Sequence, residues 1–199
     1  MRLYRFLKPI VRVLCAFIIR LRIKKPAIEL PDGPVVICCN HVHALDPIVL
    51  AFAVKRPIHF MSKKELFAKK WLAKLITVLG AYPVDRQGND IKSIKHFMGL
   101  LKENKVVGLY PEGTRSRDGQ VHAFHGGGAM LALRTGASIV PAAVSGNWKF
   151  MSRVSLVLGE PLDLSKYSGR KATQEDIQAV TEKLEQTVKE LYEQAKELK

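Results

Sequence analysis

A histidine and an aspartate stand five residues apart in the segment NHVHALD, residues 40–46. Across a turn, the carboxylate of Asp46 could accept the ring N–H of His41, which would fix the imidazole tautomer and leave the other ring nitrogen free as a general base. The spacing is weak evidence by itself, because six histidines among 199 residues also produce such pairs by chance. The alternative is a loop histidine bonded to the backbone, with Asp46 serving only as a helix cap.

A second polar cluster, YPEGTRSR at residues 110–117, combines a turn, a glycine, hydroxyl groups and two guanidinium groups. Such a set suits an oxyanion, because guanidinium groups and closely approaching backbone N–H groups both bind one. A solvated surface loop is the alternative, since turn residues are common in loops. A third segment, YPVDR at residues 82–86, adds the guanidinium group of Arg86.

The sequence contains no motif for several other common chemistries. It has no G-x-S-x-G nucleophile elbow, no P-loop and no G-x-G-x-x-G. Its three cysteines, Cys15, Cys38 and Cys39, show no spacing typical of a zinc site or a disulfide framework. We therefore expect no bound metal and a reducing compartment.

The elements that must position these residues alternate between strands and helices. Apolar runs predict strands at 35–39, 59–62, 82–84, 106–110, 138–144 and 154–158. Periodic apolar residues predict helices at 47–54, 63–79, 89–102, 127–135 and, at the C-terminus, 173–198. This alternation predicts an α/β fold: a single domain over residues 26–199 with a mixed, largely parallel sheet flanked by helices. All three polar segments follow strands, and ligands bind at the carboxyl ends of the strands in such sheets.

Residues 1–25 form a separate, strongly basic segment with eight Lys or Arg and no acid. Its longest charge-free apolar stretch, 13–19, is too short to span a bilayer. On a helix, one side would carry Leu3, Phe6, Leu7, Ile10, Val13, Leu14, Phe17 and Leu21, and the other Arg2, Arg5, Lys8, Arg12, Arg20 and Arg22. The pattern predicts an amphipathic membrane-interface helix over 1–25. The alternative is an ordinary helix that packs its apolar stripe on the domain.

The net charge of +14, with 32 Lys and Arg against 18 Asp and Glu, permits nucleic acid, an anionic membrane or a phosphorylated substrate as partner. Only 8% of the residues are aromatic, which leaves few side chains to stack on bases. The N-terminal 25 residues contribute +8 of the charge, while residues 173–199 are mildly acidic. We therefore expect a lipid surface and an anionic substrate, and no nucleic acid.

Four blocks of the chain resemble, in order and spacing, those of the glycerolipid acyltransferase family: 40–46, 84–86, 110–116 and 139–144. The resemblance runs from about residue 33 to residue 162, and its first and third blocks are the specific ones. It implies an enzyme that moves a fatty acyl group from a thioester, acyl-CoA or acyl carrier protein, to the sn-2 hydroxyl of lysophosphatidate. The product would be phosphatidate for phospholipid synthesis, and the reaction would need no cofactor.

The resemblance also implies roles for individual residues. His41 would take the proton from the attacking hydroxyl, and Asp46 would orient His41 and stabilise its charged form. The positions that match family positions associated with the glycerol phosphate are Arg86, Glu112, Gly113, Thr114, Arg115 and, less closely, Lys63. Guanidinium groups suit the phosphate dianion, whereas Glu112 could organise them or the loop.

Two departures from the family pattern qualify this interpretation. His125 follows Phe124 where relatives usually carry a lysine, so any contact made by that lysine is in doubt. The N-terminal segment has room for one membrane helix, which implies peripheral or monotopic attachment at the cytoplasmic face of the cell membrane. A second basic and apolar stretch, 55–74, is either a further membrane-facing patch or a helix with a solvated lysine face.

Two other functions stay open at this point. The chain could acylate a different lysolipid, although the predicted oxyanion site favours a phosphorylated acceptor. It could instead be a non-catalytic basic module that binds membranes or nucleic acid, in which case His41 and Asp46 would not be needed and binding to any polyanion would be sensitive to salt.

Overall fold

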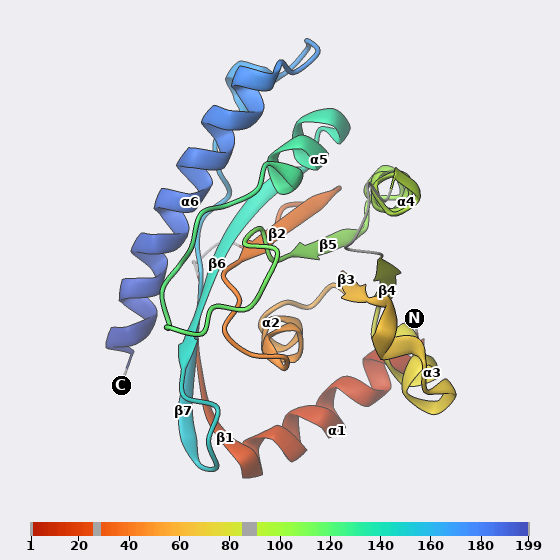
Figure 1. Cartoon of the computed structure of the whole chain (residues 1–199), viewed down its shortest axis with the longest axis vertical. Coiled ribbons are helices and arrows are strands. Elements are labelled where there is room, and N and C mark those ends of the chain that lie inside the picture. The colour runs from red at the N-terminus through yellow and green to blue at the C-terminus, as the bar shows by residue number, and fades with distance from the viewer. Residues whose placement is uncertain (1, 26–28, 85–90, 199) are drawn as a thin grey trace.

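A seven-stranded sheet forms the centre of the protein in a computed structural model that describes residues 2–25, 29–84 and 91–198 (Figure 1). The strands lie in the order β1-β7-β6-β2-β5-β3-β4, and only β6 and β7 pair antiparallel. This arrangement confirms the predicted α/β domain with a mixed, largely parallel sheet. The strands are β1 (Ile19–Lys24), β2 (Val35–Cys39), β3 (Ile58–Lys63), β4 (Ala81–Val84), β5 (Val106–Leu109), β6 (Ser138–Gly146) and β7 (Ser152–Leu158).

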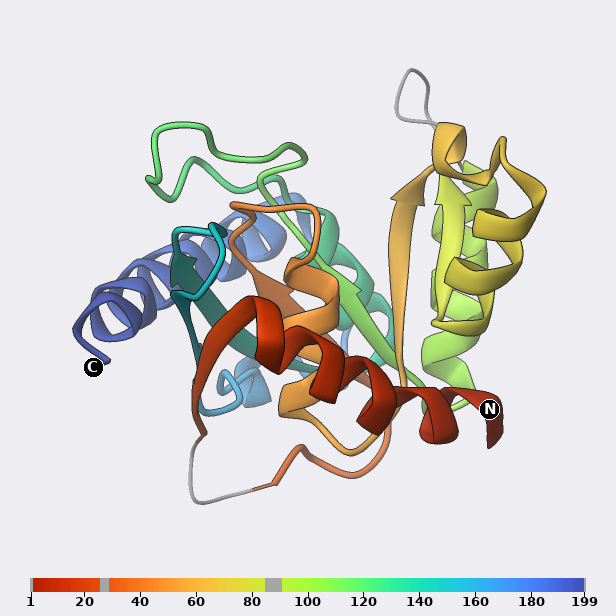
Figure 2. The ribbon, with the colours of Figure 1, turned by 90° about the horizontal axis from the view of Figure 1, so that it is seen from below.

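Helices cover both faces of this sheet (Figures 1 and 2). They are α1 (Arg2–Ile18), α2 (Asp46–Ala53), α3 (Lys70–Val78), α4 (Ile91–Lys102), α5 (Gly127–Thr135) and α6 (Gln174–Glu197), with 3-10 turns at Lys64–Phe67 and Ser165–Tyr167. Side chains of α4, α5 and α6 form the core on one face, and α2 forms the core on the other. Strand β2 is buried along its whole length because it lies between these two cores, which is typical of a central parallel strand.

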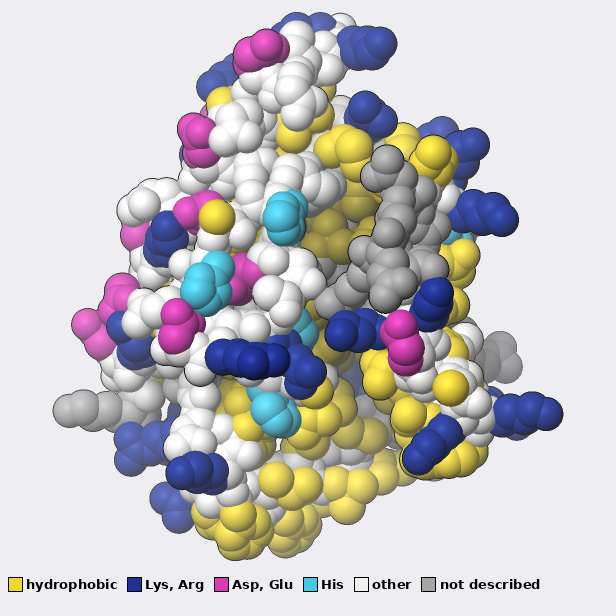
Figure 3. Space-filling model, in the orientation of Figure 1, with side chains coloured by type: hydrophobic (Ala, Val, Ile, Leu, Met, Phe, Trp, Pro, Cys, Tyr) yellow, Lys and Arg dark blue, Asp and Glu magenta, His cyan; other side chains and the backbone are white. Residues whose placement is uncertain are grey.

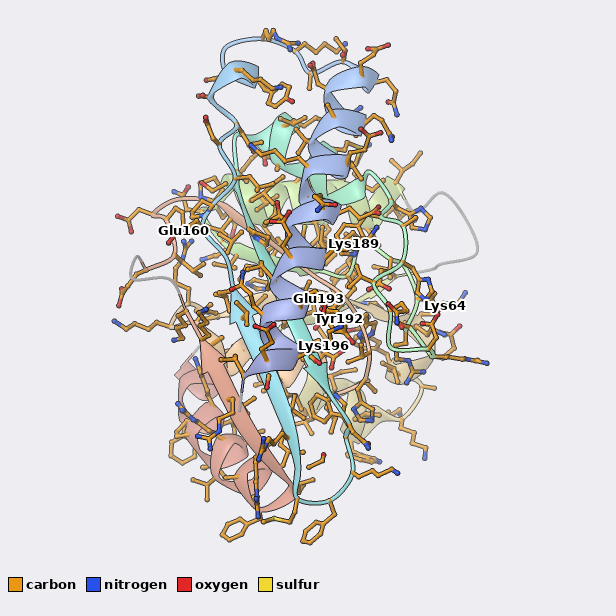
Figure 4. The ribbon with its side chains drawn as sticks, turned by 90° about the vertical axis from the view of Figure 1, so that its left-hand side faces the viewer. Lys64, Glu160, Lys189, Tyr192, Glu193 and Lys196 are labelled. Atoms are coloured by element: carbon orange, nitrogen blue, oxygen red, sulfur yellow. The ribbon has the colours of Figure 1, made fainter. Side chains whose placement is uncertain are left out.

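Helix α6 is the longest element, and its start matches the predicted cap (Figure 4). The Thr173 side chain accepts a hydrogen bond from the Asp176 backbone, and the Asp176 carboxylate accepts one from the Thr173 backbone. This reciprocal capping box satisfies two N–H groups that a helix start leaves without partners. The buried residues Val180, Leu184 and Val188 then hold the helix against the sheet.

The N-terminal segment differs from its prediction, because the helix ends at Ile18 and residues 19–24 form strand β1. In this strand Ile19, Leu21 and Ile23 alternate with basic residues, which is the two-residue period of a half-buried strand. Pairing with β7 in parallel register gives its backbone hydrogen-bond partners. The predicted helix over 1–25 was therefore too long by seven residues, since the alternation after Ile18 indicates a strand.

Helix α1 turns its apolar stripe away from the protein. Phe6, Val13, Leu14 and Phe17 are all more than half exposed, whereas the amine of Lys8 donates to the backbone oxygen of Val54, directly after α2. These four residues of the stripe therefore do not pack on the domain, whereas Leu21, which belongs to β1, packs against the core. Figure 3 shows hydrophobic side chains gathered along the lower edge of the molecule, where α1 lies. Within the described residues, no helix has the length and apolarity needed to cross a membrane.

The predicted helix over 63–79 is interrupted in the structure. Lys63 is the last residue of β3, residues 64–67 form a 3-10 turn, and α3 begins at Lys70. The extended backbone of Lys69, with φ −88° and ψ 112°, separates the two helical pieces.

Candidate active site

The first predicted cluster lies in the loop that joins β2 to α2, and Asn40 fixes the start of this loop. The buried Asn40 side chain donates to the backbone oxygen of Val144 at 2.9 Å and accepts from the backbone nitrogen of the same residue at 2.7 Å. Val144 belongs to β6, the strand next to β2. The loop therefore leaves the sheet at a position set by two strands.

His41 and Asp46 meet within this loop. One oxygen of the Asp46 carboxylate, Oδ2, lies 2.8 Å from Nδ1 of His41 and also accepts from the backbone nitrogens of Val42 and His43, each at 2.8 Å. The Asp46 side chain is 1% exposed and that of His41 is 12% exposed. With Nδ1 donating to the carboxylate, Nε2 of His41 is left unprotonated and available to accept a proton. Helix α2 begins at Asp46 itself, so this carboxylate orders the loop rather than capping the helix.

Tyr110, directly after the neighbouring strand β5, supports the His41 ring. The two rings stack with their centroids 4.1 Å apart and their planes at 22°. Burial raises the pKa of Tyr110 well above its ordinary value, so its phenol is neutral. The residue pattern alone predicted no separate role for Tyr110. Its place directly after β5, which pairs with β2, is the signal that could have found it.

Glu112 joins the second predicted cluster to the first. Its Oε1 accepts from the backbone nitrogen of His41 at 2.8 Å, and its Oε2 accepts from the backbone nitrogen of His122 at 3.2 Å. The Ser116 backbone nitrogen donates in turn to the His41 carbonyl at 2.7 Å. Burial raises the pKa of Glu112, because the carboxylate has lost much of its contact with water. Glu112 thus holds two loops together across neighbouring strands.

The loop over 110–126 is held from its outer side by α6, beside which it runs in Figure 4. The Tyr192 hydroxyl donates to the Gly119 carbonyl at 2.5 Å, and Glu185 accepts from the backbone nitrogen of Phe124 at 2.9 Å. The C-terminal helix therefore fixes a loop that belongs to the site, a role that its sequence did not reveal.

A cavity of about 470 Å³ opens beside the turn over residues 110–114. Its apolar wall comes from Met61, Val84 and Leu109, and its polar rim includes Thr114 and His125. The His125 ring also packs against the turn at position 113, where φ is +71° and a side chain would come within 3.2 Å of that ring. The residue that departs from the family pattern therefore lines the site.

The remaining predicted residues are less closely assembled. Gly113, Thr114 and Arg115 are exposed on the turn that follows Glu112. The hydrogen bond from the Ser116 backbone to the His41 carbonyl brings Arg115 beside the loop over 40–46. Burial lowers the pKa of His43 in that loop, the carboxylate of Asp46 opposes this, and the positive charge of Arg115 adds to it.

Of the two remaining predicted cations, the structure places Lys63, which lies toward the far end of the same edge of the sheet. Lys63 ends β3, where it pairs in register with Val84 of β4. Arg86 lies outside the described residues.

Cys38 and Cys39 are buried as free thiols in β2, the strand that the apolar run over 35–39 predicted. Burial raises the pKa of Cys38 to about 12, so it is not a nucleophile at neutral pH. In the part of the chain that the structure describes, no three His, Cys, Asp or Glu side chains are grouped so that they could hold a metal ion.

Known proteins share this sequence and this fold. A family model described as Acyltransferase matches residues 20–145. A 1-acyl-sn-glycerol-3-phosphate acyltransferase of Bacillus subtilis is 36% identical over 166 residues, which cover 80% of this chain and 82% of the relative. A protein of the same name from Streptococcus pneumoniae is 28% identical over 173 residues, which cover 83% of this chain and 63% of that protein.

The fold also matches a solved structure. The crystal structure of a 1-acyl-sn-glycerophosphate (LPA) acyltransferase from Thermotoga maritima superposes with a TM-score of 0.73 at 21% identity, covering all of this chain and 79% of that one. This likeness shows the fold alone, whereas the family model and the Bacillus relative extend to the sequence of the site. The chain belongs to the acyltransferase family.

Proposed function

We propose that this protein transfers a fatty acyl group from a thioester to the sn-2 hydroxyl of lysophosphatidate. The observation that carries the proposal is the contact of 2.8 Å between Nδ1 of His41 and the buried carboxylate of Asp46. It fits a base that takes a proton from a hydroxyl, which is the step that acyl transfer to an alcohol requires. The relatives named above act on 1-acyl-sn-glycerol-3-phosphate, which supports this acceptor.

In the proposed mechanism, Nε2 of His41 accepts the hydroxyl proton as the acceptor oxygen bonds to the thioester carbonyl carbon. The tetrahedral intermediate then expels the thiolate by breaking the C–S bond, and His41 returns the proton to that sulfur. Asp46 stabilises the imidazolium that exists between these two transfers, and the stacked Tyr110 ring keeps the imidazole in plane. No acyl-enzyme forms in this scheme.

For the phosphate of the acceptor we assign the exposed cations and the turn of the second cluster. Arg115 is exposed and precedes Ser116, whose backbone nitrogen donates to the His41 carbonyl, so its guanidinium group can reach a dianion at this loop, and the Thr114 hydroxyl adds a donor. Gly113 lets the acceptor approach the turn closely because it has no side chain, while its own N–H group donates to the Tyr110 carbonyl at 3.0 Å. Lys63 and Arg86 are proposed to contribute charge on the approach to the site. Glu112 acts on the protein instead, since both of its oxygens accept backbone hydrogen bonds.

A membrane surface is the proposed source of the acceptor. The exposed apolar stripe of α1, with basic residues beside it, fits the interface of an anionic bilayer. We therefore propose peripheral or monotopic attachment at the cytoplasmic face of the cell membrane. The donor is an acyl thioester, either acyl-CoA or acyl carrier protein.

The test is an acyl-transfer assay of purified protein with labelled acyl-CoA and acyl carrier protein against a panel of lysolipids. We expect lysophosphatidate to be the preferred acceptor and His41→Ala to lower turnover by about 10²–10⁴-fold. Unchanged turnover in His41→Ala would refute the catalytic assignment. A preference for another lysolipid would refute the acceptor, and no turnover with any pair would favour the non-catalytic binding module.

Arg115→Ala should raise the KM for lysophosphatidate by about tenfold to a hundredfold, because a charge-assisted contact with phosphate is lost. Arg117→Ala, a change of equal charge two residues along the same exposed loop, is the matched control. Equal effects of the two changes would show that only the overall charge of the loop matters and would argue against a specific phosphate contact.

A further inference from the structure

The turn between β6 and β7, residues 147–151, exposes an aromatic side chain at its tip. Phe150 is 79% exposed and the neighbouring Met151 is 42% exposed. Large apolar side chains on a surface loop cost solubility unless they have a partner, and two adjacent ones at the end of a hairpin form a small, protruding apolar point.

This tip is an ordered turn. The backbone nitrogen of Lys149 donates to Asn147 at 2.7 Å, and the backbone nitrogen of Ser152 donates to Lys149 at 3.0 Å. The Ser152 hydroxyl also donates to the Lys149 carbonyl, at 2.6 Å. Met151 has a φ of 59°, a left-handed conformation that residues with a side chain rarely adopt. The protein thus keeps a methionine outward at a position where glycine or asparagine would be less strained.

The tip is attached to the end of α1. The Met151 backbone nitrogen donates to the Ile18 carbonyl at 2.7 Å, and Ser152 pairs with Ile19 where β1 begins. Figures 1 and 2 both show the turn beside this end of the helix. Phe17, which is 70% exposed, and Ile18 are therefore close to Met151, so the tip extends the exposed apolar stripe of α1.

Cations surround this apolar point. Arg153 lies directly beside Arg20 in the register of β7 and β1, and Lys149 is exposed on the turn itself. Like charges placed side by side on neighbouring strands repel one another, and neither arginine has an acidic partner among the described residues. The segments 1–25 and 145–159 contain no Asp or Glu at all. An apolar point with a basic surround is complementary to an anionic lipid surface.

The base of the same turn contacts the catalytic loop. The Trp148 indole stacks on the His43 ring with centroids 4.6 Å apart and planes at 18°. The backbone nitrogen of His43 donates to the Asp46 carboxylate that also binds His41. The turn therefore contacts the loop that carries the proposed base through this stack, and a hydrogen bond within the loop connects His43 to Asp46.

We propose that the β6–β7 turn is a second membrane-inserting element, which places Phe150 and Met151 among the lipids of an anionic bilayer beside the end of α1. The inference rests on the proposed function to the extent that the acceptor is a lipid. Two insertion points, the α1 stripe and the turn, fix the rotation of the protein on the surface, and the Trp148 stack then holds the catalytic loop at a defined place relative to that surface.

A bilayer fits this tip better than a second copy of the chain does. Stable protein interfaces bury about 1,200–2,000 Å² in total, which two side chains at a hairpin tip do not supply. A symmetric pair would also bring the cations of one tip toward those of the other, with no acid in either segment to offset them.

The test compares Phe150→Ser with the conservative change Phe150→Trp and with a control, Ile91→Ser. Ile91 is 59% exposed at the start of α4, which covers the opposite face of the sheet from α2. Each protein is sedimented with vesicles of phosphatidylcholine containing phosphatidylglycerol. We expect Phe150→Ser to lower the vesicle affinity by about tenfold or more and the other two to leave it within about twofold. Equal thermal melts show that all three variants fold.

Two further measurements separate the possible failures. Acyl transfer by Phe150→Ser should fall with lysophosphatidate in vesicles and match the wild type with a short-chain acceptor dissolved in water. Unchanged vesicle affinity of Phe150→Ser overturns the proposal. If light scattering in addition shows that Phe150→Ser changes the molar mass of the protein in solution, the tip contacts a second copy of the chain instead of lipid. A wild type that binds vesicles through Phe150 but acylates neither acceptor contradicts the proposed function and leaves the insertion standing.

Discussion

Replacing Asp46 by asparagine isolates the charge of the carboxylate that organises the catalytic loop. The change keeps the size of the side chain and keeps one oxygen at the position of Oδ2, where three hydrogen bonds converge from His41, Val42 and His43. It also places an amide nitrogen at the position of Oδ1, which is buried without a hydrogen-bond partner among the described residues.

The expected loss of stability follows from these contacts. A hydrogen bond to a charged group contributes about 1.5–3 kcal/mol, and its neutral counterpart is about half as strong. Three weakened bonds therefore remove about 2–4.5 kcal/mol, and the buried amide nitrogen adds a desolvation penalty of about 1–3 kcal/mol. The sum is a substantial part of the 5–15 kcal/mol that is usual for a domain, so Asp46→Asn should fold but melt at a lower temperature.

The effect on catalysis is expected to be larger than that on folding and to act through His41. A neutral amide does not stabilise the imidazolium, so turnover of the folded variant should fall by about 10²–10⁴-fold. Turnover is measured in the acyl-transfer assay at a temperature where circular dichroism shows the variant to be folded. The double variant His41→Ala/Asp46→Asn should turn over no more slowly than His41→Ala alone, because Asp46 has no partner to act on once the imidazole is gone.

Additive losses in the double variant would refute this reasoning. They would mean that Asp46 acts on the reaction independently of His41, for example by shaping the loop that receives the substrate. A fully active Asp46→Asn would refute it as well, since the imidazolium would then need no charged partner.

Three other changes test the surrounding structure. Burial lowers the pKa of His43 below its ordinary 6.5, so the unfolded chain binds more protons than the folded one. The free energy of unfolding should therefore fall as the pH drops through 6.5. Urea titrations from pH 5 to 8 should show that the free energy of unfolding of His43→Gln depends less on pH, and the same pH dependence as in the wild type would refute the assignment. Gly128→Ala puts a Cβ 2.8 Å from Sγ of Cys38, and the overpacking should cost about 1–3 kcal/mol by the same titration. Thr173→Ala removes one half of the capping box and should cost about 1 kcal/mol, which a shift of the melting temperature would report. Thr187→Ser, in the middle of α6, keeps the hydroxyl that donates to the Lys183 carbonyl and should leave the melting temperature unchanged.

The sequence predicted the central elements well because their signals are local. Strand β2 is an unbroken apolar run, and the pattern of threonine followed by acidic residues marks the start of α6. Strand β1 was missed because its six residues also fit the helical pattern of apolar and basic residues that begins in α1. They form a strand because they pair with β7. Local periodicity could not reveal that long-range pairing.

In the candidate site, too, the contacts between residues close in sequence could be predicted and the long-range contacts could not. The spacing of His41 and Asp46 predicted their hydrogen bond, because both residues belong to one short loop. The contacts of Tyr110 with His41 and of Trp148 with His43 join residues 69 and 105 positions apart, so no local pattern predicts them. They depend on the order of strands in the sheet, which the sequence alone did not establish.

That strand order brings together the first and third of the four blocks, residues 40–46 and 110–116. Strand β2 lies between β6 and β5, so the loop after β2 is flanked by a segment from each neighbour. Asn40 fixes it to β6 through two hydrogen bonds, and Glu112 fixes it to the loop after β5 through the backbone of His41. The position of the proposed base is thus set from both sides by backbone contacts, before any substrate binds. Such preorganisation is what a proton transfer within hydrogen-bond distance requires. Because the exposed cations take no part in these contacts, they can be changed to suit another acceptor without moving the proposed base.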